Sequence, residues 1–116
     1  KFIGDAIMAY WNAPLDVENH ADMAVKTSLE QLEALNELNK KFEKDKLPTI
    51  DIGIGLNSGE VIVGEMGSSL RSDYTVIGDA INLGSRVESL CKYYGSKLNI
   101  TNFTKDKLKE KYILLQ

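Results

Sequence analysis

The longest regular pattern in this chain lies between residues 20 and 44, and it limits the possible folds most. Apolar side chains recur there every three or four residues, and charged or amide side chains fill the positions between them. This period is typical of an amphipathic helix that buries one face. Residues 12–19, which include a proline, are predicted to form a loop that ends in a helix cap. The apolar positions of the predicted helix are Val25, Leu29, Leu32, Leu35, Leu38 and Phe42.

A β-hairpin is predicted before this helix. Residues 1–3 and 6–11 are apolar and rich in aromatic side chains. Gly4 and Asp5 between them are typical of a two-residue turn with glycine first, at a position that requires a positive φ. Asp5 is therefore expected at the tip of the hairpin.

A second hairpin is predicted after the helix. In residues 50–56, isoleucine and leucine alternate with aspartate and glycine, a pattern that indicates a strand with one buried face. Residues 57–59, with the sequence Asn-Ser-Gly, are typical of a short turn. The segment 60–66 is therefore expected to return and pair with 50–56.

A strand and a helix are predicted in direct succession in the second half. After a polar loop over 67–72, residues 73–77 have the tyrosine, threonine, valine and isoleucine content of a strand. From 79 to 94 the apolar positions again follow a helical period, and Gly95 is placed to cap the C-terminus.

Shorter elements are predicted at the end of the chain. Residues 98–100 form a short strand candidate, and Thr101 or Asn102 would cap a basic helix that continues to about Lys111. Residues 112–115 look like the start of another strand. With no repeat or linker, the segment is predicted to be one α+β sheet domain.

Composition excludes several other classes. A chain of 116 residues fits one small domain, and its net charge of -3 gives no electrostatic reason to bind nucleic acid. Its single cysteine, Cys91, excludes an intrachain disulfide. No apolar run approaches the roughly 18 residues of a membrane span, so no direct membrane contact is expected for this segment.

Asp5 is the first candidate for chemistry. A hairpin tip would project its carboxylate while the strands hold it in place, and Mg²⁺ prefers such oxygen ligands. Magnesium sites usually combine one or two carboxylates with water and substrate phosphates. The alternative is that Gly-Asp is simply a favourable turn.

Asn82 and Arg86 are the second candidate. Four residues apart on a helix, they share one face. An amide can both donate to and accept from a ribose or a base, and a guanidinium matches the geometry of phosphate. The alternative is a solvated helix surface that carries these two residues.

Three ordered segments resemble the class III adenylyl and guanylyl cyclases: residues 1–11, 53–64 and 74–86. The resemblance implies a ferredoxin-like α+β catalytic domain, with an antiparallel-rich sheet covered by helices, that works as a head-to-tail homodimer with sites at the interface. It also implies that residues 1–116 are a partial catalytic domain, which lacks the first strand and the C-terminal strands. The family's first metal-binding aspartate would lie upstream, and a phosphate-binding lysine downstream, so this fragment itself is expected to be inactive.

The resemblance also implies roles for individual residues. Asp5 matches the second of two aspartates that hold two Mg²⁺ or Mn²⁺ ions on the nucleotide triphosphate. Lys1 and Thr75 match the pair that reads the base. Asn82 matches a ribose-orienting amide, and Arg86 matches the ligand of the transition-state phosphate. In a homodimer, Asp5 would serve one site and the other four residues the second site.

The implied reaction is conversion of ATP to 3′,5′-cyclic AMP and pyrophosphate in a signal-transduction protein. ATP is favoured because guanine-reading members resemble Glu and Cys at the positions of Lys1 and Thr75. A guanylate cyclase, or a degenerate cyclase-like module that senses nucleotides or dimerises, is the alternative. Because ATP is the expected substrate, the domain is expected in the cytoplasm, in a parent that could be anchored to a membrane.

Overall fold

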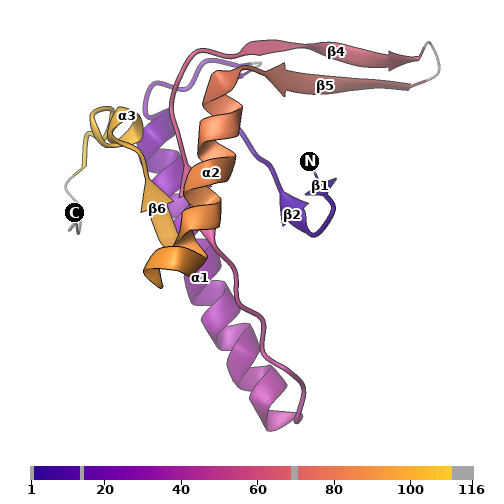
Figure 1. Ribbon diagram of the computed structural model, residues 1–116, viewed down its shortest axis with the longest axis vertical. Coiled ribbons are helices and arrows are strands. Elements are labelled where there is room, and N and C mark those ends of the chain that lie inside the picture. The colour runs from indigo at the N-terminus through magenta and orange to yellow at the C-terminus, as the bar shows by residue number, and fades with distance from the viewer. Residues whose placement is uncertain (1, 14, 69–70, 111–116) are drawn as a thin grey trace.

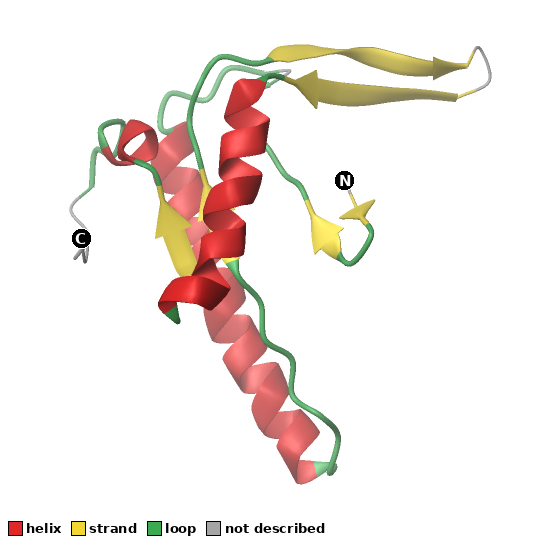
Figure 2. Ribbon diagram, in the orientation of Figure 1, coloured by secondary structure: helices red, strands yellow, loops and turns green. Residues whose placement is uncertain are grey.

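The computed structural model describes residues 2–13, 15–68 and 71–110 of the chain. A long helix, α1, runs the length of the molecule, and the other elements gather around its N-terminal half (Figures 1 and 2). Within the described ranges no helix combines the length and the apolarity that a membrane span requires. In chain order the elements are β1 (Phe2–Ile3), β2 (Ala6–Ile7), α1 (His20–Lys44), β3 (Ile54–Leu56), β4 (Ile62–Ser68), β5 (Arg71–Ile77), α2 (Asp79–Tyr94), β6 (Leu98–Ile100) and α3 (Asn102–Lys105).

The first hairpin forms where the sequence predicts it. β1 and β2 pair in antiparallel register, and Gly4 between them has a φ of 58°. A positive φ suits glycine, which has no Cβ to clash with the backbone. The prediction that the second strand continues to residue 11 is wrong, because β2 ends at Ile7. Since β1 is only two residues long in the described part, the residues after Ile7 have no ladder partner there.

The predicted second hairpin is wrong. β3 does not pair with β4 but lies parallel to β6, with Ile54 opposite Leu98. β4 pairs instead with β5, along an antiparallel ladder that runs from Ile62 opposite Ile77 to Ser68 opposite Arg71. That ladder extends into the predicted polar loop 67–72, and the β4–β5 ribbon projects from the molecule in Figure 1. An antiparallel ladder over seven-residue strands offers more backbone hydrogen bonds than the short β3 can provide.

Helix α1 has the predicted bounds, but its apolar stripe is only partly covered. Its fully buried residues all lie near the N-terminus, and Leu29 and Leu38 are 45% and 42% exposed. At the other end, Lys46 has a φ of 60°, and the Leu47 N–H donates to the Phe42 carbonyl at 2.7 Å. This bond closes the helix in a Schellman-type cap.

The segment after α1 is held at Ile50 by the side chain of Asn39 and not by a neighbouring strand. The Asn39 amide donates to the Ile50 carbonyl at 2.8 Å, and its oxygen accepts from the Ile50 N–H at 2.9 Å. Asn39 thereby satisfies both backbone groups that a neighbouring strand would otherwise bind. The strand predicted over 50–56 is accordingly shorter, and only Ile54–Leu56 joins a ladder.

The basic helix predicted to continue to Lys111 is also shorter. α3 is a single turn, Asn102–Lys105, capped by the Thr101 hydroxyl as the sequence suggests. Beyond it, the N–H groups of Lys109 and Glu110 bind Asp22, so the chain leaves the helical path. The strand predicted over 112–115 lies outside the described residues.

Asp22 fastens the end of the described chain to the start of α1. The residue is 5% exposed, and its carboxylate accepts from the N–H of Lys109 at 3.0 Å and from that of Glu110 at 3.0 Å. These two backbone donors, that of Glu110 first, hold the pKa of Asp22 below its ordinary value, because they favour the charged form. Folding therefore gains stability from this carboxylate at neutral pH.

We expect this contribution to disappear in acid. Because the pKa of Asp22 is lowered in the folded protein, the contribution is fully present above the unfolded carboxyl pKa of about 4, and it is lost as the pH falls through the folded value. Urea unfolding of wild type and Asp22→Asn should differ clearly at pH 7 and converge below about pH 4. The matched control is Asp51→Asn, at an exposed position. An equal difference at both pH values would contradict the expectation.

Candidate functional site

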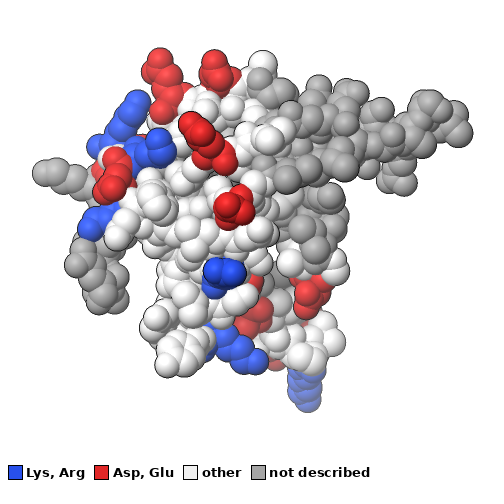
Figure 3. Space-filling view, turned by 45° about the horizontal axis from the view of Figure 1, so that its top comes forward, with Lys and Arg blue, Asp and Glu red and all other residues white. Residues whose placement is uncertain are grey.

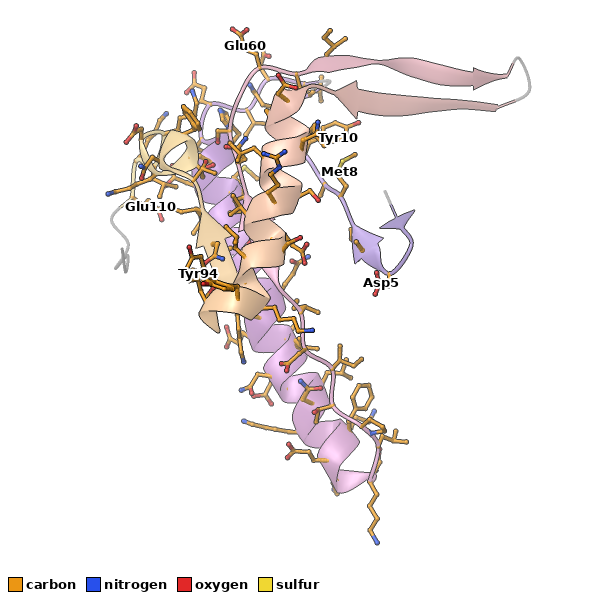
Figure 4. All side chains as sticks on the ribbon, in the orientation of Figure 1. Asp5, Met8, Tyr10, Glu60, Tyr94 and Glu110 are labelled. Carbon is orange, nitrogen blue, oxygen red and sulfur yellow. The ribbon has the colours of Figure 1, made fainter. Side chains whose placement is uncertain are left out.

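The site is built where β5 runs into α2. Gly78 joins the two elements with a φ of 157°, and α2 begins at the next residue, Asp79. A Cβ added at Gly78 would lie 3.3 Å from the Glu60 carbonyl oxygen. The backbone before β4 therefore passes close to the start of α2, and Figure 4 shows Glu60 at that end of the helix.

A cleft of about 550 Å³ lies at this junction. One wall is the segment 57–60, and another is the first two turns of α2. The exposed ring of Phe103 from α3 completes the lining. Polar and charged groups from α2 and from the segment before β4 thus share one concave surface, a common property of ligand sites.

Helix α2 places Asn82 and Arg86 together in this cleft. Both side chains are exposed, and both line it. Among the described residues, neither side chain makes a hydrogen bond or an ion pair. An amide and a guanidinium that are one turn apart and free of protein partners suit a ligand that carries hydroxyl and phosphate groups. Their individual roles stay predictions.

The remaining predicted residues lie elsewhere. Asp5 is exposed at the tip of the β1–β2 hairpin, apart from the start of α2, near which Glu60 lies (Figure 4). Thr75 lies in β5 opposite Gly64, three residues before Gly78. Lys1 lies outside the described residues. A single chain thus brings two of the predicted residues together and keeps Asp5 away from them.

Asp5 suits one ligand position of a divalent cation but does not make a complete site. Its carboxylate is accessible, and oxygen is the ligand atom that Mg²⁺ prefers. Within the described ranges no group of three or more His, Cys, Asp or Glu side chains could hold a metal ion. Asp5 therefore needs further oxygen ligands from water, from a substrate or from elsewhere in a larger protein.

Charge is mixed around the cleft. Glu60 and Asp79 contribute carboxylates to the lining, and Arg86 contributes the cation. On the face drawn in Figure 3, acidic and basic side chains are interspersed among uncharged ones. Binding of an anionic group in the cleft would therefore depend on Arg86 itself and not on a broad basic surface.

Sequence reasoning missed the polar network beneath the cleft. Asn57 and Ser58 were predicted only as turn residues, but their side chains bind α2 and α3 respectively. The signal in the sequence is the small polar residues at positions 57, 58, 101, 102 and 104. Such a run does not reveal which hydroxyl meets which amide, because the partners are more than forty residues apart.

Comparisons with known proteins agree with this geometry. The sequence model of the adenylate and guanylate cyclase catalytic domain matches residues 1–116. An adenylate cyclase of Anabaena cylindrica is 40% identical over 105 residues, which cover 87% of this chain and 20% of that protein.

Solved structures agree as well. The structure of a bacterial light-regulated adenylyl cyclase matches with a TM-score of 0.76 at 32% identity, over 97% of this chain and 32% of that chain. The crystal structure of the guanylyl cyclase Cya2 matches with a TM-score of 0.74 at 34% identity, over 84% of this chain and 49% of that chain. These structures confirm the predicted α+β cyclase fold class. The chain spans 20% or less of the length of the first curated relatives it matches.

Proposed function

Because the chain belongs to the adenylate and guanylate cyclase catalytic domain family, we propose that it is part of an adenylate cyclase that converts ATP to 3′,5′-cyclic AMP and pyrophosphate. The observation that carries the proposal is the placement of Asn82 and Arg86 in the cleft at the start of α2, where neither side chain binds another of the described residues. A degenerate module that only dimerises would need neither residue. The parent protein would act in signal transduction.

The reaction needs alignment and charge neutralisation more than a protein nucleophile. The ribose 3′-hydroxyl attacks the α-phosphate in line, and pyrophosphate leaves. Asn82 would orient the ribose through its amide, since it can both donate and accept. Arg86 would neutralise the charge that develops on the phosphoryl group, with its guanidinium donors.

Divalent ions complete the proposed chemistry. Asp5 would hold Mg²⁺ or Mn²⁺, two ions in the complete site, together with oxygen ligands from outside the described residues. When bound, such ions neutralise the triphosphate and position it. The separation of Asp5 from Asn82 and Arg86 within one chain supports a homodimer, in which each site takes Asp5 from one protomer and the other residues from its partner.

GTP is the second candidate substrate. A guanylyl cyclase, Cya2, is among the structures that this chain resembles. Lys1 and Thr75 favour ATP in our proposal, because a lysine can donate to an adenine ring nitrogen and the threonine hydroxyl can assist.

The test is cyclic nucleotide formation by the protein extended along its gene to a complete catalytic domain, since the present chain spans 49% of the Cya2 chain. We expect cyclic AMP from Mn²⁺-ATP, little cyclic GMP from Mn²⁺-GTP, and no product from residues 1–116 alone. A folded, dimeric, complete domain that makes no cyclic nucleotide would overturn the proposal. Cyclic GMP as the main product would establish the second candidate.

Base selection has its own prediction. The double substitution Lys1→Glu and Thr75→Cys should shift the ratio of kcat/KM for ATP over GTP toward GTP by about 10-fold or more, because the hydrogen-bonding partners of the base change. The matched control combines Lys26→Glu in α1 with Thr49→Cys, both at exposed positions. An unchanged ratio in the first double variant would remove the base-reading assignment.

A further inference from the structure

We infer that Asn57 is a positioning residue that fixes the first turn of α2, and thereby the place of Asn82 and Arg86 in the cleft. The inference rests on the proposed function, because it assigns the consequence of that placement to cyclase activity. It adds a residue that the sequence indicated only as part of a turn.

Asn57 joins three parts of the fold through one amide group. Its Nδ2 donates to the carbonyl of Ala80, in the first turn of α2, at 2.9 Å. Its Oδ1 accepts from the Thr101 hydroxyl, just after β6, at 2.6 Å. Asn57 itself directly follows β3, where the Thr101 N–H donates to the Leu56 carbonyl at 3.1 Å. The side chain therefore links the start of α2 to the ends of both parallel strands.

Thr101, which binds Asn57 at the ends of the two strands, is itself held by hydrogen bonds. Thr101 caps α3 by accepting from the Thr104 N–H, and the Thr104 and Ser58 hydroxyls are 2.9 Å apart. Thr104 is only 1% exposed. A buried side chain with a hydrogen-bond partner has little freedom to move. Thr101 and Thr104 therefore restrict the motion of Asn57, and through it the motion of α2.

The first turn of α2, which Asn57 binds, also carries Asn82, and Arg86 lies one turn further along the helix. Asn57 binds the backbone carbonyl of Ala80, two positions before Asn82 and six before Arg86. Asn57, Asn82 and Arg86 all line the cleft, so the bond lies beside the residues that it positions. Because a helix moves as a stiff unit over one or two turns, release of Ala80 would displace both residues. A displacement of about 1 Å can cost roughly 100-fold in rate.

The experiment compares two identical substitutions in the complete domain. Asn57→Asp loses the amide donor to Ala80 and keeps the oxygen that accepts from Thr101. Asn39→Asp loses the donor to Ile50 and keeps the oxygen that accepts from the Ile50 N–H. Both lost bonds run from a side-chain amide to a backbone carbonyl and have similar lengths, but the bond of Asn39 is exposed and lies on α1, away from the cleft that Asn57 lines. Both variants should therefore have a lower Tm.

Of these two variants, only Asn57→Asp should change catalysis. We expect its kcat with Mn²⁺-ATP to fall about 10- to 100-fold while KM changes less than about 3-fold, because Arg86 is expected to act in the transition state. Thr101→Val, which keeps the bond to α2, should lower kcat less. Asn39→Asp should keep the wild-type kcat once the folded fraction is taken into account.

A second measurement separates the inference from the proposed function. Amide hydrogen exchange over residues 79–86 should be faster in Asn57→Asp than in Asn39→Asp, whether or not the protein is active. An inactive wild type would overturn the proposed function and leave the exchange data to decide whether Asn57 holds α2. Equal exchange in the two variants, or an unchanged kcat in Asn57→Asp, would overturn the inference.

Discussion

Replacement of Arg86 with alanine should lower kcat for cyclic AMP formation about 100- to 1000-fold in the complete domain, with a much smaller change in KM. The guanidinium would act mainly on charge that develops in the transition state, and loss of one such donor typically has this effect. Lys92→Ala is the matched control, since it removes a cation from the last turn of the same helix. A kcat within a few-fold of wild type for Arg86→Ala would show that Arg86 does not stabilise the transition state.

A mixture of two inactive variants tests the same residue more sharply. Asp5→Ala alone should also abolish most activity, because it removes a proposed metal ligand. If each site takes Asp5 from one protomer and Arg86 from the other, a heterodimer of Asp5→Ala and Arg86→Ala has one site with both residues intact. Random mixing makes half of the dimers heterodimers, so about a quarter of wild-type activity should return. No recovery would mean that Asp5 and Arg86 of the same protomer act together in one site.

The second large effect concerns stability. Gly55 in β3 lies directly against the backbone of α2, and a Cβ added there would stand 2.2 Å from the Glu88 nitrogen and 2.6 Å from the Gly84 carbonyl oxygen. Neither backbone atom can move without shifting the helix. We therefore expect Gly55→Ala to lower the free energy of unfolding by about 3 kcal/mol or more, measured by urea unfolding.

Gly84 offers the matched control in the facing helix. A Cβ added there would lie 3.7 Å from the Cβ of Asn57, an ordinary van der Waals distance. Alanine is also the better helix former, by about 1 kcal/mol. Gly84→Ala should therefore leave stability unchanged or raise it. A Gly55→Ala protein as stable as Gly84→Ala would show that β3 does not pack on α2 as closely as described.

Local patterns predicted most elements and the pairing of β1 with β2, but not the partners of β3 and β4. The apolar period gave the bounds of α1 and α2, and Gly4 and Gly95 marked a turn and a helix end because both adopt a positive φ. The partner of β3 could not be predicted, because β4, β5 and α2 lie between β3 and its parallel partner β6 in the chain, and no local pattern spans that distance. Short glycine-containing turns between two strand-like segments suggested a local hairpin instead.

Of the candidate site, the sequence predicted the helix face but not the cleft. The spacing of Asn82 and Arg86 placed them on one helix face, because helix geometry depends only on the local sequence. The cleft that receives them, and the amide of Asn57 that holds the helix, come from residues distant in sequence. Hydrogen-bond partners of this kind are set by tertiary packing, and no periodicity indicates them.

The parallel pairing of β3 with β6 also fixes when the cleft can assemble. Ile54 and Leu98 are more than forty residues apart, so this ladder closes a long loop of chain, whereas the β1–β2 hairpin joins neighbouring residues. Contacts between distant segments form slowly, because the entropy of loop closure is lost before any bond is gained. During synthesis, the hairpin that carries Asp5 can form early, but the cleft must wait until Thr104 has left the ribosome. A stalled or shortened chain would therefore present Asp5 without the surface that is proposed to bind the nucleotide.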